Sequence, residues 1–189
     1  MLLGQNVVGA TLGIIGFGRI GKEMARLASG FRMRILVPDT SSDREGAAEV
    51  GAELVPYEEL LKESDYISLH VALNDETFRM IGADEFARMK PTAILINAAR
   101  GRVVDTNALV EALTSGQILA AGLDVSDPEP LPADHPLVGL PNCTIAPHIA
   151  SATVQTRTAM ANMAARNLVA YLKGTEPPYI VNPTVLKDR

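Results

Sequence analysis

Three side chains in the second half of the sequence have the chemistry of a site that binds an acid and moves a proton. Arg100 carries a planar, permanently charged guanidinium group that suits a carboxylate or a ketone oxygen. His148 is one of three histidines, and a histidine exchanges protons readily near neutral pH. The carboxylate of Glu129 can hold the imidazole ring in position. The alternative, that His148 is a packed loop histidine, is less favoured because both partners are present.

A second group of residues has the pattern of a phosphate-binding turn. Residues 16–21 read GFGRIG, which is G-x-G-x-x-G placed between an expected strand and an expected helix. In this pattern Gly16 permits the tight turn, Gly18 lets a pyrophosphate approach the backbone, and Gly21 allows close packing. The N–H groups of Arg19 and Ile20 at the helix start would hold the phosphates.

An acidic residue follows the next expected strand, at Asp39. A carboxylate about 20 residues beyond such glycines accepts hydrogen bonds from the adenosine ribose and repels a 2′-phosphate. The sequence therefore favours NAD over NADP. Two alternatives remain open at this point: Asp39 caps the loop before Asp43, or the nearby Arg44 interacts with a 2′-phosphate.

The elements that must position these residues follow from the alternation of apolar runs with helical patterns. The runs are continuous rather than alternating, as expected when helices cover both faces of a parallel sheet. This order predicts an α/β fold with a doubly wound parallel sheet of the Rossmann type. Asp105 and Gly116 are a good N-cap and a good stop for one helix. The tail 179–189 is expected to be extended. The expected strands are 11–15, 33–37, 53–55, 66–69, 93–96, 119–123 and 143–145, and the expected helices are 20–29, 43–50, 57–63, 83–89, 106–115 and 154–173.

Three segments lie at or just beyond the carboxyl ends of expected strands, where open α/β sheets bind their ligands. They are residues 96–105, 122–132 and 146–151, and they contain Arg100, Glu129 and His148 respectively. We expect the three side chains to converge at this edge of the sheet.

Composition excludes several classes of protein. The 189 residues carry 17 Lys and Arg against 22 Asp and Glu, for a net charge of −5, which argues against nucleic-acid binding. A single cysteine excludes an internal disulfide and a paired-cysteine zinc site, and favours a cytoplasmic setting. No cluster has metal-ligand spacing, so we expect no metal. Both uncharged stretches, 1–18 and 136–156, are interrupted by polar residues, glycine or proline, so we expect a soluble chain without a membrane span.

The motifs together resemble one family. Residues 16–21, Asn-Ala-Ala-Arg-Gly at 97–101, Leu-Asp-Val with Glu-Pro-Leu-Pro within 123–132, and Pro-His-Ile at 147–149 are similar to the D-isomer-specific 2-hydroxyacid dehydrogenases. That family includes D-3-phosphoglycerate dehydrogenase and glyoxylate/hydroxypyruvate reductase. The resemblance covers nearly the whole chain. It implies an NAD-dependent oxidoreductase that transfers a hydride between NAD(H) and a D-2-hydroxy acid or 2-keto acid.

The resemblance also implies roles for single residues. Arg100 would anchor the substrate, Glu129 would support His148, and His148 would be the acid/base. Arg100, His148 and Asp124 would also lie at the cofactor, with Asp124 at the nicotinamide carboxamide. Further contacts to the cofactor would come from Val71, Ala98, Ala99, Ala150 and Ser151. Departures from the family pattern at Ser126, Ala72 and Pro38 leave the substrate unspecified.

Family members carry a substrate domain that this chain largely lacks. We therefore expect a lead-in segment at 1–9, an NAD-binding domain at 10–174, and a tail at 175–189 that would return to the missing domain. The family usually dimerises through its cofactor domains, which predicts a homodimer. The alternative function is a non-catalytic NAD(H)-binding or protein-interaction module.

Overall fold

The computed structural model describes residues 4–40 and 43–188 of the chain. It divides into two compact units, Met1–His148 and Ile149–Arg189, and each is described by itself. The long helix that the sequence places inside the cofactor domain belongs to the second unit.

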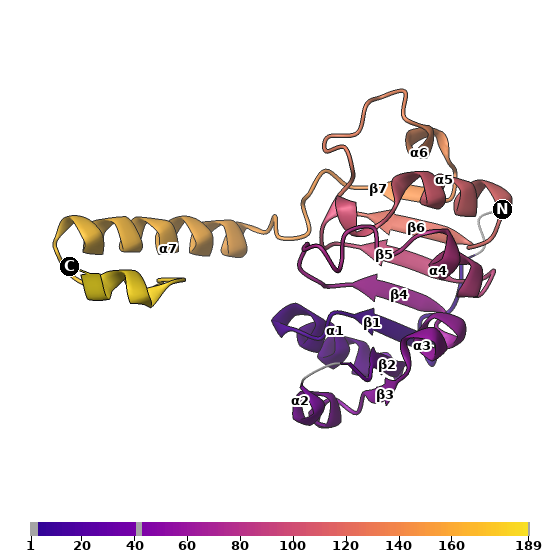
Figure 1. The fold of residues 1–189 in the computed structure, drawn as a ribbon, viewed down its shortest axis with the longest axis horizontal. Helices are drawn as coiled ribbons and strands as arrows, with labels where there is room; N and C mark the ends of the chain where they lie inside the picture. The colour runs from indigo at the N-terminus through magenta and orange to yellow at the C-terminus, as the bar shows by residue number, and fades with distance from the viewer. Residues whose placement is uncertain (1–3, 41–42, 189) are drawn as a thin grey trace. The chain divides into compact units, whose positions relative to one another are not determined.

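The first unit is built on one parallel sheet of seven strands (Figure 1). The strand order is β3-β2-β1-β4-β5-β6-β7, so the chain winds outward from β1 in one direction and then from β4 in the other. This confirms the expected doubly wound α/β fold and places its switch point between β1 and β4. The strands are β1 (Thr11–Ile15), β2 (Arg34–Pro38), β3 (Glu53–Val55), β4 (Tyr66–Leu69), β5 (Ile94–Asn97), β6 (Ala120–Leu123) and β7 (Cys143–Ile145).

The helix at residues 106–115 begins and ends where local signals predict. The Asp105 side chain accepts hydrogen bonds from the N–H groups of Asn107 and Ala108, and Gly116 has a left-handed φ of 73°. These are the N-cap and stop expected for the helix between them. The helices are α1 (Arg19–Ser29), α2 (Arg44–Glu49), α3 (Tyr57–Glu63), α4 (Ala83–Arg88), α5 (Thr106–Ser115) and α6 (Pro136–Gly139), with a 3₁₀ turn η1 (Gly101–Val103).

The core lies in two clusters because successive strand residues face opposite sides of the sheet. On β2, Ile35 and Val37 join the cluster that contains Ala25 and Ala28 of α1, whereas Leu36 joins the cluster that contains Phe86 of α4. All three β2 residues are buried. Helices on both faces therefore explain why the strand sequences are continuously apolar.

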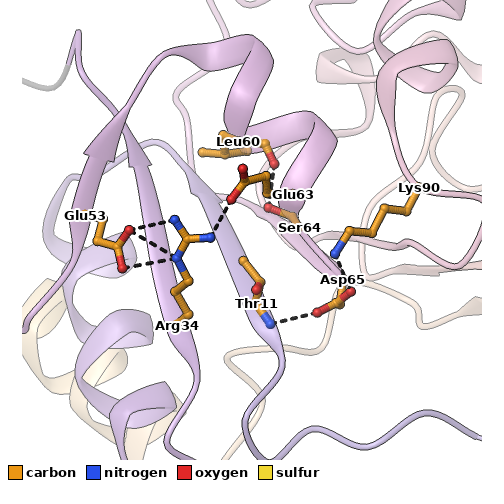
Figure 2. A network of polar contacts seen from close by, with 8 residues as sticks. All are labelled: Thr11, Arg34, Glu53, Leu60, Glu63, Ser64, Asp65 and Lys90. Carbon is orange, nitrogen blue, oxygen red and sulfur yellow. Dashed lines mark hydrogen bonds and ion pairs between the residues drawn. The ribbon is translucent and has the colours of Figure 1, made fainter.

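Polar contacts join the amino ends of the strands (Figure 2). Asp65, just before β4, accepts hydrogen bonds from the N–H of Thr11 at 2.9 Å and from Lys90 Nζ at 2.7 Å. Partial burial opposes ionisation, but these two bonds hold the pKa of Asp65 below its ordinary value. Arg34 pairs with Glu53 and Glu63 at the same edge. This network fixes the strand register at the edge opposite the glycine turn.

The second unit contains residues 149–153, α7 (Val154–Leu172) and the segment that follows this helix. The side chain of Asn167 donates to the carbonyl of Tyr179 at 2.8 Å and accepts from the Tyr179 N–H at 3.0 Å, which fastens this segment to the helix. The expectation of an extended tail is wrong in part, because η2 (Pro183–Asp188) is a 3₁₀ helix. Pro183 favours it by fixing φ near a helical value. No helix in the described residues is long and apolar enough to cross a membrane.

Candidate functional site

The glycine turn packs directly against the end of β4. Gly16 has a φ of +98°, and a Cβ at this position would lie 2.5 Å from the backbone carbon of His70 and from the Val71 nitrogen. A Cβ at Gly21 would lie 2.1 Å from the Gly16 carbonyl oxygen. Both positions therefore require glycine for conformation or for close backbone contact.

Gly18 differs from its two neighbours, because a Cβ built there would meet no atom within 4 Å. It is the N-cap of α1 and has no side chain to bond the first N–H groups of the helix. The N–H groups at a helix start have no acceptor within the helix. The open space at Gly18 and the helix-start N–H groups of Arg19 and Ile20, both exposed residues, fit a pyrophosphate at this turn.

Asp39 follows β2 and is exposed beside the loop into α2. Its backbone N–H donates to the Val55 carbonyl at 2.8 Å, which fixes the turn. The N-cap of α2 is Asp43, whose side chain accepts from the N–H of Gly46. Arg44 Nη2 lies 3.5 Å from the Asp39 carbonyl oxygen. The Asp39 carboxylate thus stands after β2, at the same end of the sheet as the glycine turn.

The three segments expected to converge lie side by side in the structure. The Asp124 N–H donates to the carbonyl of Asn97 at the end of β5, at 2.9 Å. The His148 N–H donates in turn to the Asp124 carbonyl, also at 2.9 Å. These bonds continue the sheet ladder beyond β5, β6 and β7, so the segments after these strands form one continuous edge.

His148 and Glu129 are in direct contact. Nδ1 of His148 lies 2.7 Å from Oε1 of Glu129. This hydrogen bond is the main cause that holds the pKa of Glu129 below its ordinary value, and the Ser126 N–H and the charge of Arg100 act in the same direction. An ionised carboxylate only accepts hydrogen bonds, so Nδ1 carries the proton and Nε2 is left to face a ligand.

The backbone at His148 is itself unusual. Its φ of 54° lies in the left-handed region, which non-glycine residues rarely adopt. Such a conformation persists only where the surrounding contacts impose it, and it is frequent at functional sites. Here the N–H of His148 is held by the Asp124 carbonyl.

Arg100 is positioned by a residue that the sequence reasoning did not single out. Asn97 is 1% exposed at the end of β5. Its side-chain nitrogen donates to the Arg100 carbonyl at 2.9 Å, and its side-chain oxygen accepts from the Ala99 N–H at 3.0 Å. The turn is thus closed by one buried amide. A polar residue ending an apolar strand is the sequence signal that indicates such a role.

A cavity of about 720 Å³ opens beside His148 and Glu129. The polar part of its lining includes Asp124, which is half-buried. The rest is mainly apolar, which is common in sites for small molecules. Its lining residues are Asp124, Ser126, Glu129, Pro130, Leu131, Ala133, Val138, Cys143, Ile145, Ala146, Pro147 and His148.

The remaining expected cofactor residues fall into two sets. Val71 lies half-buried after β4, next to the glycine turn, and Ala98 and Ala99 lie in the turn closed by Asn97. Ala150 and Ser151 belong to the second unit. Within residues 4–40 and 43–188, no group of three or more His, Cys, Asp or Glu is arranged to hold a metal ion.

The sequence of this chain is similar to that of known proteins. Residues 1–150 match the family described as D-isomer specific 2-hydroxyacid dehydrogenase, NAD binding domain. The chain is 53% identical over 189 residues to a glyoxylate reductase of Korarchaeum cryptofilum (strain OPF8), covering all of this chain and 57% of that protein.

Two solved structures are similar in fold as well as in sequence. A D-lactate dehydrogenase with NAD+ from Lactobacillus jensenii matches with a TM-score of 0.86 and 36% identity, over 95% of this chain and 57% of that one. A glyoxylate reductase from Paecilomyes thermophila matches with a TM-score of 0.85 and 38% identity, over 97% and 55%. The chain therefore spans a little more than half the length of these relatives.

Proposed function

The chain belongs to the D-isomer-specific 2-hydroxyacid dehydrogenase family, and we propose that it is the NAD-binding part of an oxidoreductase that interconverts a D-2-hydroxy acid and a 2-keto acid. The observation that carries this proposal is the contact of His148 with Glu129, on a strand-end edge shared with Arg100. A non-catalytic NAD(H)-binding module would need the glycine turn, but it would not need Glu129, His148 and Arg100 together.

Each of the three side chains has a defined task in the proposed reaction. Arg100 binds the substrate carboxylate and polarises the carbonyl. Glu129 holds the Nδ1 proton of His148, so Nε2 donates a proton to the carbonyl oxygen during reduction and accepts it during oxidation. When bound, NAD(H) supplies or accepts the hydride. Both residues of the proton relay stand beside the cavity next to Asp124.

The cofactor fits the glycine turn because Gly18 leaves space where the family's pyrophosphate would lie. We propose that Asp39 accepts hydrogen bonds from the adenosine ribose and that Asp124 contacts the nicotinamide carboxamide. Backbone groups at Val71, Ala98, Ala99, Ala150 and Ser151 complete the proposed cofactor contacts, and Arg100 and His148 reach the nicotinamide side.

Replacing Asp39 by alanine is expected to weaken NADH binding about ten- to a hundredfold, because a charged hydrogen-bond acceptor of the ribose is lost. NADPH binding should be unchanged or tighter, because repulsion of the 2′-phosphate is relieved. Fluorescence titration with both cofactors measures the ratio. Glu111→Ala, which removes an exposed acid on α5, is the control. An unchanged ratio in Asp39→Ala would show that Asp39 does not face the ribose.

The proposed function is tested at two levels. The 189-residue chain itself should bind NADH, detected by a change in nicotinamide fluorescence, but should not reduce glyoxylate, hydroxypyruvate or pyruvate at enzyme-like rates. Turnover needs a substrate held in a site closed from water, and we propose that a substrate domain outside this chain provides that closure. The full-length protein should reduce at least one of these acids. Failure of the chain to bind millimolar NADH would contradict the cofactor assignment.

We also propose that the protein is a cytoplasmic homodimer whose subunits associate through the NAD-binding domain, residues 10–174. The family's usual mode of association and the single cysteine support these two statements. Sedimentation velocity of the full-length protein distinguishes a dimer from a monomer.

A further inference from the structure

The loop that carries Glu129 is fastened to a different element at Asp127. The hydroxyl of Thr106, the first residue of α5, donates to the Asp127 carbonyl oxygen at 3.0 Å. Arg102 in η1 places Nε 3.3 Å from Oδ1 of the same residue. The main chain and the side chain of Asp127 are therefore held from two separate points that follow Arg100 in sequence.

The turn η1 and the loop that carries Glu129 are also in close backbone contact. A Cβ at Gly101 would lie 1.9 Å from the carbonyl oxygen of Ser126. A separate cavity of about 240 Å³ is lined by Thr106, Asp127 and Pro128. The cavity between Gly101 and Ser126, also lined by Thr106 and Asp127, has a volume of about 10 Å³. That volume is at the limit for one water molecule. The loop cannot move toward η1, and the two bonds to Asp127 oppose movement away from it.

Inside the loop, a short series of contacts leads from Asp127 to the proposed acid/base. The Ser126 hydroxyl donates to the Pro128 carbonyl at 2.9 Å, and the Ser126 N–H lies 3.4 Å from Oε2 of Glu129. The other oxygen of Glu129 meets His148 at 2.7 Å. Displacing Asp127 would therefore move the carboxylate away from the imidazole.

We propose that Thr106 and Arg102 are positioning residues that hold the Glu129 carboxylate against His148 by fixing Asp127. This inference rests on the proposed function and adds residues to it that touch neither substrate nor cofactor. Because Arg102 and Thr106 lie in the segment that follows Arg100, the same contacts couple the position of the substrate anchor to that of the proton relay. A misplacement of about 1 Å in such a site can reduce turnover about a hundredfold.

Thr106 contributes more than Arg102. The Thr106 hydroxyl bonds a carbonyl in a partly buried position, where an unmet acceptor is costly. The Arg102 side chain is 62% exposed, and exposed ion pairs contribute little.

The test compares Thr106→Val, which removes the hydroxyl at nearly constant shape, with Thr106→Ser, which keeps it. Carbon-detected NMR of the 189-residue chain follows the titration of the Glu129 carboxyl. Thr106→Val should raise the pKa of Glu129 toward its ordinary value, because the His148 bond that lowers it is weakened. Thr106→Ser, which keeps the hydroxyl, should leave the pKa of Glu129 as it is in the unsubstituted chain. The carboxyls of Asp43 and Asp65 serve as references for the whole fold. Hydrogen bonds with Lys22 and Lys90, outside the Glu129 loop, lower the pKa of these two groups.

Kinetics of the full-length protein supply the second readout. Thr106→Val should reduce kcat about ten- to a hundredfold with little change in the KM for NADH, and Thr106→Ser should restore it. Thr114→Val is the matched control, since the Thr114 hydroxyl donates to the Val110 carbonyl within its own helix. Arg102→Gln, at an exposed position, should act in the same direction more weakly and provides the test if Thr106→Val does not fold.

Two outcomes separate this inference from the proposed function. An unchanged Glu129 titration and an unchanged kcat in a folded Thr106→Val protein would overturn the positioning role and leave the proposed function standing. The opposite outcome is a shifted Glu129 titration in Thr106→Val, together with an unsubstituted protein that reduces no 2-keto acid. That outcome would support the positioning role and overturn the proposed function.

Discussion

Replacing His148 by alanine is expected to reduce turnover of the full-length protein by about 10²–10⁴, the range for loss of a positioned general acid. The imidazole is the group that can exchange a proton beside Glu129, and its Nδ1 is committed to that carboxylate at 2.7 Å. No other histidine lines the cavity, since His135 caps α6 and His70 bonds Ser68. The affinity for NADH should change little, because the glycine turn is untouched.

The measurement is kcat at saturating substrate, paired with an NADH titration of the same protein. His135→Ala is the control, because it removes a histidine whose Nδ1 accepts from the Leu137 N–H at 3.2 Å, away from the cavity beside His148. That variant should retain turnover. A His148→Ala protein that turns over normally would disprove the acid/base assignment, whatever the state of NADH binding.

Replacing Gly18 by alanine is expected to weaken NADH binding about ten- to a hundredfold while leaving the fold as stable as before. The added methyl group meets no protein atom within 4 Å, and φ at this position is −78°, which alanine adopts freely. The methyl would instead occupy space that the pyrophosphate needs. Insertion of a methyl into a filled site costs about 1–3 kcal/mol, which sets the expected loss of affinity.

Gly21→Ala provides the contrast within the same turn. Its Cβ would lie 2.1 Å from the Gly16 carbonyl oxygen, so the backbone of the turn must shift. This variant should lower the melting temperature as well as the affinity. Thermal unfolding and NADH titration of both variants, on the 189-residue chain, separate the two effects. Normal NADH binding by Gly18→Ala would mean that the pyrophosphate does not lie on this turn.

The sequence alone was enough to predict the fold class and the strand ends after which Arg100, Glu129 and His148 lie. Strands buried on both faces have continuous apolar sequences, and the caps at Asp105 and Gly116 are local signals. The strands and the helix ends could therefore be predicted without knowledge of tertiary contacts. The carboxyl ends of parallel strands meet at one edge, which is why Arg100, Glu129 and His148 could be expected to converge.

The contact of Glu129 with His148 was expected from the sequence, and the tertiary structure supplies its geometry, 2.7 Å between Nδ1 and Oε1. His148 also has a left-handed backbone, and no local pattern indicates that conformation. The helix α6 has four residues and the 3₁₀ helix η2 has six, too few turns for a hydrophobic period to be recognised, so the sequence did not predict them. The bond from the Thr106 hydroxyl to the Asp127 carbonyl joins residues 21 positions apart, whereas the buried amide of Asn97 closes a local turn with Ala99 and Arg100. The partner of Thr106 is set by strand order and packing, because this hydrogen bond exists only once the fold has brought donor and acceptor within about 3 Å.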